Sequence, residues 1–153
     1  MYNDITQIKQ TLARYCHLVD QGQPAAVAAL FSEDAVLAPK YDGDYEVSGR
    51  PAIQGWYEYY EANFKSGIRH LKHLIHSIAI DLDGDGASGS CYLTAYMISK
   101  ADGLAYQAQG TYVDRYAKSN EQWLFKRREI YVEFVTACGT PIEHMEPLGY
   151  QPA

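Results

Sequence analysis

Two side chains that lie far apart in the sequence are of the types that acid–base catalysis uses. Asp20 ends an amphipathic segment, and His73 opens a segment in which apolar residues alternate. A carboxylate that accepts a hydrogen bond from one imidazole nitrogen fixes the tautomer and makes the ring a better base near neutral pH. A helix C-terminus disfavours a negative charge that has no positive partner. Asp20 and His73 are therefore a candidate acid–base pair, and the alternative is a surface aspartate and an ordinary strand histidine.

Arg128 is a candidate for stabilising negative charge. By strand alternation, the aromatic residues of 123–125 share one face of the strand. Arg128 shares the other face with the alternating apolar residues of 130–134. A β-bulge around residues 126–127 would bring Arg128 inward with that set. There it could bind a substrate oxygen or a leaving anion, or pair with Asp20. The alternative is a solvated Lys-Arg-Arg run.

Tyrosine dominates the aromatic residues, with 14 Tyr against 4 Phe and 2 Trp. A tyrosine has an apolar ring and a polar hydroxyl group, which suits a partly hydrated cavity or an interface. Tyr15 can reach the same pocket as Asp20, where its phenol could donate to a developing enolate. The alternative for Tyr15 is a core aromatic residue. The predicted walls of the pocket are Trp56, Tyr57, Tyr60, Tyr96 and Tyr112.

The periodicity of apolar residues predicts helices first and long strands afterwards. The predicted helices cover residues 4–20, 24–31 and 51–64, and the predicted strands cover residues 35–39, 71–82, 87–99, 105–116 and 122–135, with a hairpin or loop over residues 40–50. This order predicts an α+β fold with helices packed on one face of a curved sheet. One domain over residues 1–136 and an irregular tail over residues 137–153 are expected, because the tail is rich in Gly and Pro.

The strand that contains His73 changes phase along its length. His73 and Ile75 share one face by alternation, whereas Ile78 and Ile80 share the other. If His73 and Ile80 are to face the same cavity, the strand needs a bulge near Ser77, and bulges occur beside active sites.

Six short motifs occur in an order that resembles a known family. They are I-x6-Y-x4-D-x-G from Ile8, L-F-x-x-D-A from Leu30, G-x3-I-x2-W from Gly49, H-x6-I-x2-D-G-D-x-A from His73, G-x-Y-x-D from Gly110 and W-x-F-x2-R from Trp123. Together they span residues 5–135 and are similar to the SnoaL-like branch of the NTF2-like superfamily. The resemblance implies a cone of three N-terminal helices packed on a strongly curved, mostly antiparallel sheet.

The resemblance also implies a function. The local likeness is to members built on an Asp–His pair, such as scytalone dehydratase, bile-acid dehydratase and hexachlorocyclohexane dehydrochlorinase, in which the two side chains meet at the cavity floor. Two departures stand out: Ser77 replaces an asparagine of many relatives, and Tyr96 and residues 107–109 offer no late-strand acid of the kind that cyclases use. The expected activity is a cofactor-independent lyase or isomerase (a dehydratase, cyclase or double-bond isomerase) acting on a small apolar oxygenated molecule.

Two other classes stay open because this fold hosts many functions. One is a small-ligand-binding or assembly module that uses the same cavity without turnover. The other is an epoxide hydrolase, which would need two carboxylates around a water, whereas Asp20 is the one obvious inward acid.

Several kinds of site and partner are not expected. The net charge of −6 argues against nucleic acid or an anionic membrane surface. The residues Asp81, Asp83 and Asp85 begin like a calcium loop, but the twelfth position is Tyr92 instead of glutamate. The histidines at 70, 73 and 76 would alternate sides of a strand, so no metal and no cofactor are expected.

The chain is expected to be cytoplasmic, because it has no apolar run of membrane-spanning length and no signal peptide at its start. It is also expected to bind a second copy of itself. Tyr92, Val113, Tyr116 and Tyr131, or the residues on the other phase of the same strands, would give the outer face of the sheet more apolar surface than solvent favours. A homodimer is the default and a trimer the alternative.

Overall fold

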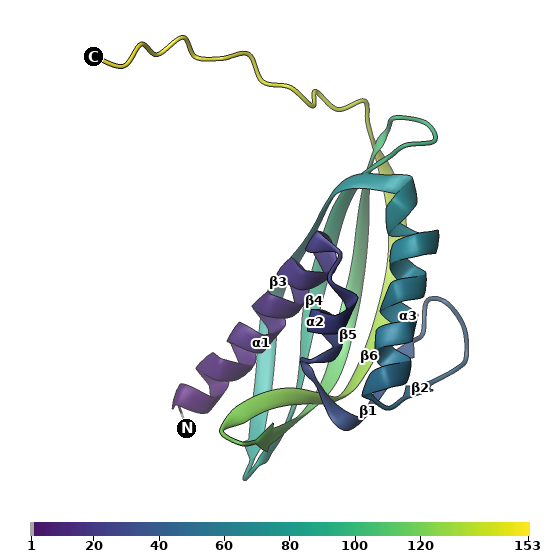
Figure 1. Cartoon of the computed structure of the whole chain (residues 1–153), viewed down its shortest axis with the longest axis vertical. Coiled ribbons are helices and arrows are strands. Elements are labelled where there is room, and N and C mark those ends of the chain that lie inside the picture. The colour runs from purple at the N-terminus through teal and green to yellow at the C-terminus, as the bar shows by residue number, and fades with distance from the viewer. Residues whose placement is uncertain (1) are drawn as a thin grey trace.

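The computed structural model describes residues 2–153, and three helices precede the long strands (Figure 1). The helices are α1 (Tyr2–Gln21), α2 (Pro24–Ala28) and α3 (Arg50–Asn63), followed by the 3-10 turn η1 (Lys65–Gly67). The strands are β1 (Phe31–Pro39), β2 (Val47–Ser48), β3 (Ile68–Asp83), β4 (Gly86–Ser99), β5 (Ala105–Ser119) and β6 (Gln122–Gly139).

The strands form one six-stranded sheet in the order β2-β1-β6-β5-β4-β3. The β1–β6 pair is parallel and every other pair is antiparallel. The three helices lie on the same side of this sheet in Figure 1, and α1 packs along β3. The predicted α+β fold of helices on a mostly antiparallel sheet is confirmed.

The helical layer is joined to the sheet by a buried apolar core and by a few polar contacts. Ile8 and Leu12 of α1 are buried against the sheet. Trp123, at the start of β6, is 2% exposed, and its Nε1 donates to Asp4 Oδ1 over 2.9 Å. The Thr11 hydroxyl donates to the Trp123 carbonyl oxygen at 2.9 Å, so both ends of this tryptophan hold α1 in place.

Two β-bulges set the direction in which the site residues point. In β3 the register shifts between His76 and Ala79, and Ser77 has a φ of 52°. In β6 the register passes from Arg127 to Phe125, which leaves Lys126 as the extra residue. Both bulges were predicted from the change of apolar phase, and both are confirmed.

Several boundaries differ from the prediction. The helix expected over residues 24–31 ends at Ala28, because the Leu30 carbonyl oxygen accepts from the Phe125 amide at 2.9 Å and Phe31 pairs with Phe125. This parallel pairing starts β1 four residues before the predicted strand. The expected loop 40–50 contains β2, and β6 continues past residue 136 because Gly139 pairs with Ala105.

Tyr116 was predicted on the outer face of the sheet, and that prediction is wrong. Tyr116 shares its side of β5 with Tyr112 and Asp114 and is 3% exposed. Its hydroxyl donates to Asp114 Oδ2 at 3.0 Å. Across residues 2–153, no helix has both the length and the apolar character needed to cross a bilayer.

Candidate active site

The structure brings Asp20 and His73 into direct contact. His73 Nδ1 lies 2.6 Å from Asp20 Oδ1, and the His73 backbone amide donates to Asp20 Oδ2 at 3.0 Å. Their side chains are 11% and 9% exposed for His73 and Asp20, respectively. Both carboxylate oxygens are thus held by one residue, which orients the imidazole ring. No described residue bonds to His73 Nε2, and in the neutral tautomer whose Nδ1–H donates to Asp20 this nitrogen carries the lone pair of the ring.

The end of α1 positions the carboxylate. Gly22 has a φ of 69° and its amide donates to the Val19 carbonyl oxygen at 3.1 Å, which ends the helix just after Asp20. The positive φ is the reason for glycine here, because the atoms nearest to an added side chain are the flexible ends of Glu61 and Lys65, which can move aside. The last turn of α1 is therefore fixed beside the start of β3.

Arg128 is buried with no exposed surface and does not pair with Asp20. Its Nε donates to Asp114 Oδ1 and its Nη2 to Asp114 Oδ2, both at 2.8 Å. Burial opposes the charge, but the Asp114 carboxylate outweighs it and raises the pKa of Arg128 well above its usual value. The alternative of a solvated basic run is wrong for Arg128, because the Lys126 bulge turns it inward.

Aromatic rings surround the Arg128 guanidinium. Its Cζ lies 3.9 Å from the ring centroid of Tyr112 and 4.2 Å from those of Tyr15 and Phe125. Such contacts add to the attraction from Asp114 because each ring presents a negative face to the cation. Nη1 has no hydrogen-bond partner in the part of the chain that the structure describes. The cluster therefore contains one buried donor nitrogen that no described group uses.

Tyr15 and Tyr57 form a buried pair of phenols. Their hydroxyl oxygens are 2.6 Å apart, and the two residues are 2% and 3% exposed. Burial raises the pKa of Tyr15, and it raises that of Tyr57 well above its usual value, so both phenols stay protonated near neutral pH. Because one hydroxyl donates to the other, a proton of this pair remains free for a further acceptor.

Four of the five predicted wall residues are buried in the core or packed against it, and the fifth is exposed. Trp56 and Tyr60 of α3 stack with centroids 5.6 Å apart, and Tyr57 and Tyr112 are buried. Tyr96 is 45% exposed because it lies on the side of β4 that faces away from the helices. The prediction of Tyr96 as a wall residue is therefore wrong.

Sequence reasoning missed two polar partners. Asp114 was part of the G-x-Y-x-D motif, but its role as the partner of Arg128 follows from the β5–β6 register, in which the two residues are opposite. Tyr57 was treated as a wall residue only, although its hydroxyl holds that of Tyr15. Within residues 2–153, no group of three or more His, Cys, Asp or Glu side chains is arranged to hold a metal ion.

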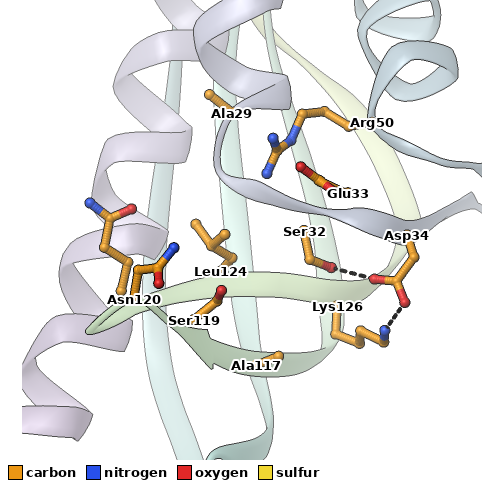
Figure 2. Close-up of a pocket in the computed structure, with 11 residues that line it drawn as sticks. Ala29, Ser32, Glu33, Asp34, Arg50, Ala117, Ser119, Asn120, Leu124 and Lys126 are labelled. Carbon is orange, nitrogen blue, oxygen red and sulfur yellow. Dashed lines mark hydrogen bonds and ion pairs between the residues drawn. The ribbon is translucent and has the colours of Figure 1, made fainter.

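Two surface hollows lie outside the aromatic interior. The first, of about 750 Å³, is lined by β1, by the hairpin of β5 and β6, and by Ala29 and Arg50, and Lys126 pairs there with Asp34 (Figure 2). It contains none of the predicted site residues. The second, of about 670 Å³, is lined by Asp20 together with residues of α3, η1 and β3. The second hollow therefore adjoins the Asp20–His73 pair.

Comparison with known proteins decides the family. The model of the SnoaL-like domain matches residues 1–129. The chain belongs to the SnoaL-like domain family. A candidate scytalone dehydratase of Novosphingobium aromaticivorans superposes on this SnoaL-like chain with a TM-score of 0.77, at 25% identity over 95% of this chain and 97% of that chain.

Two further relatives are enzymes by name. A hexachlorocyclohexane dehydrochlorinase has the same fold, with a TM-score of 0.77 at 14% identity over 97% of each chain. A steroid Δ-isomerase of Nocardioides simplex is 43% identical over 51 residues, which are 33% of this chain and 41% of that protein. This curated relative is thus matched over about two fifths of its length.

Proposed function

We propose that this SnoaL-like protein is a cofactor-independent lyase or isomerase whose general base is His73. The observation that carries the proposal is the 2.6 Å contact between His73 Nδ1 and Asp20 Oδ1, with Nε2 unbonded. A protein that only binds a ligand has no need of an imidazole with one nitrogen anchored and the other free. The names of the relatives, an isomerase and a dehydrochlorinase, agree with such chemistry.

The proposed first step is proton abstraction from a carbon next to a carbonyl group or next to a carbon that bears a leaving group. His73 Nε2 takes the proton, and the Asp20 carboxylate stabilises the imidazolium that forms. In an isomerisation the imidazolium returns the proton to another carbon of the same molecule. In a dehydration it delivers the proton to the departing hydroxyl group, which leaves as water. Both outcomes restore neutral His73.

Arg128 and Tyr15 are proposed to stabilise the negative charge that develops on the substrate oxygen. Arg128 has one buried donor, Nη1, that Asp114 does not use. Tyr15 is a protonated phenol, and Tyr57 fixes its hydroxyl. Donors that are already in place before the reaction stabilise charge without having to reorganise.

The proposed substrate is small, largely apolar and oxygenated. Trp56 and Tyr60 of α3 and Tyr112 of β5 place aromatic rings in or against the core between the helices and the sheet. The names of relatives include a steroid and a chlorinated cyclohexane, which are apolar molecules of this kind. Aromatic walls bind apolar rings, whereas a few polar groups orient them.

Proton exchange tests the proposal whatever the final product is. The chain is incubated in D₂O with a panel of small ketones, including a β,γ-unsaturated cyclic ketone, and NMR follows deuterium uptake at the carbon next to the carbonyl. The wild-type chain should catalyse uptake and His73→Ala should not. His17→Ala, which changes an exposed histidine of α1, is the matched control and should act like wild type. Equal uptake by His73→Ala and wild type would refute His73 as the base.

A second proposal concerns self-association. Six large apolar side chains on the outer face of the sheet are 37% to 55% exposed: Leu74, Tyr92, Tyr96, Val113, Tyr131 and Phe134. We call this set the outer apolar patch. A contiguous apolar surface of this kind is typical of an interface, and a second copy of the chain is the simplest partner.

A further inference from the structure

The hollow beside Asp20 is basic, although the chain as a whole carries a net charge of −6. The basic side chains that line it are Lys65, Arg69, His70, Lys72 and Lys100. Four of the 13 Lys and Arg residues of the chain therefore gather around one hollow of about 670 Å³. Its acidic lining residues are Asp20 and Glu61.

One carboxylate from the C-terminal tail is already bound at the edge of this hollow. Glu143 accepts from Arg69 Nε at 2.7 Å and from Arg69 Nη2 at 2.5 Å, and His70 Nε2 lies 3.1 Å from its Oε2. The hydrogen bonds from Arg69 lower the pKa of Glu143 to about 2. The arrangement is the two-pronged geometry by which arginine recognises carboxylate and phosphate groups.

The segment that carries Glu143 is held by little else. Residues 140–153 form no helix or strand, and the tail runs away from the sheet in Figure 1. Ile142 and Met145, on either side of Glu143, are each 87% exposed. The Arg69 and Glu143 side chains keep 38% and 23% of their surface exposed, and ion pairs that solvent reaches contribute little stability. Another anion of the same shape can therefore compete with Glu143 for Arg69.

Two further cations of the hollow have no carboxylate partner among the described residues. Lys100 Nζ donates to the Ser66 carbonyl oxygen at 2.9 Å, and Lys72 has no side-chain partner. Lys65 pairs with Glu61 at 3.0 Å. Its position just after the C-terminal end of α3 is explained by the helix dipole, which favours cations at that end. The helix dipole does not explain the positions of Arg69 and Lys72, because both residues lie on β3.

We infer that this hollow is a binding site for the carboxylate or phosphate group of a ligand, and that Glu143 is its built-in competitor. Arg69 holds the anion in its fork in place of Glu143, and Lys72 and Lys100 supply the additional positive charge. Arg69 and Lys72 pair with Ile98 and Tyr96 of β4, so their side chains share the side of β3 that faces away from the helices. The inference concerns binding alone and does not rest on the proposed catalysis.

The experiment is an NMR titration of the 153-residue chain with inorganic phosphate and, separately, with acetate. Sodium chloride keeps the ionic strength constant and serves as the reference anion. We expect saturable shifts of the Arg69 Nε–H signal and of the amides of residues 68–72. The amides of residues 141–145 should move towards random-coil values as Glu143 is displaced. Tighter binding of phosphate would identify a phosphorylated ligand, and tighter binding of acetate would identify a carboxylic acid.

Variants separate a specific site from general charge attraction. Removing an internal competitor of this strength raises the apparent affinity about 2- to 6-fold, so Glu143→Gln should bind phosphate or acetate that much more tightly. Glu146→Gln, in the same tail and without a bond to Arg69, should leave the affinity unchanged. Arg69→Ala should abolish saturable binding, and Lys72→Ala, an exposed position, should weaken it. Shifts that match those of chloride, or equal affinity in Glu143→Gln and wild type, would overturn the inference.

Discussion

Arg128 and Asp114 face each other across β5 and β6 and form a two-pronged ion pair that is hidden from solvent. Placing two charges in the interior is costly, and the pair offsets this cost only because the carboxylate and the surrounding rings compensate the guanidinium. Nη1 stays unbonded despite this. The fold thus buries a guanidinium nitrogen that no described group uses, and the proposed mechanism assigns this nitrogen to the substrate oxygen.

Removing one partner of this ion pair should lower the free energy of unfolding far more than replacing both partners. Asp114→Ala leaves Arg128 charged and buried, so the unfolding free energy should fall by about 3–5 kcal/mol. The double variant Asp114→Leu with Arg128→Met should recover much of that loss, because no charge remains buried. Urea denaturation of wild type and both variants measures these effects. A single variant that loses less than about 1 kcal/mol would show that Arg128 finds another partner.

Changes at the acid–base pair should affect turnover and leave the fold almost intact. His73→Ala should lower the rate of proton exchange about 10²- to 10⁴-fold, the usual loss for a general base. Asp20→Asn should also slow exchange, because an amide cannot offset the charge of an imidazolium. Both variants should melt close to wild type.

Trp123→Ala provides the structural comparison for these two variants. Removing a fully buried indole should cost about 3–5 kcal/mol and free α1 from the sheet. Thermal melting beside the exchange assay compares the three proteins. If His73→Ala melts as early as Trp123→Ala, then His73 has a structural role and the proposed base is wrong.

Acid should weaken the contact between α1 and β6 through Asp4. Hydrogen bonds from Trp123 and from Lys118 lower the pKa of Asp4 from 3.8 to about 2. A group with a lowered pKa in the folded state stabilises the fold above its unfolded pKa and loses that effect as the pH falls through the folded pKa. Asp4→Asn should therefore melt earlier than wild type at about pH 6, and the difference should disappear between about pH 4 and pH 2. A difference that persists below that range would contradict this account.

The outer apolar patch should hold copies of the chain together. Gel filtration with light scattering should give a dimer or trimer at micromolar concentration, and Val113→Lys or Tyr92→Glu should give a monomer, since each places a charge in the interface. Tyr59→Glu changes a residue that is 63% exposed on α3 and is the matched control. A monomeric wild-type chain would refute self-association through this face.

The order of elements and the two bulges could be predicted from the sequence because they depend on local periodicity. A change of apolar phase at Ser77 and at Lys126 is visible within a single segment of the chain. The same holds for the end of α1 at Gly22. The candidate pair came from residue type and from the family resemblance, since 53 positions separate Asp20 and His73.

Tertiary structure alone decided which polar groups meet. The partner of Arg128 depends on the register of β5 against β6, and the short helix α2 ends where the parallel β1–β6 pairing begins. Tyr96 and Tyr116 were misplaced against the alternation of their own strands, which puts Tyr96 on the side of Tyr92 in β4 and Tyr116 on the side of Tyr112 in β5. The hydrogen bond from Arg69 to Glu143 joins residues 74 positions apart. Such contacts depend on how distant segments pack, and periodicity within one segment carries no information about that.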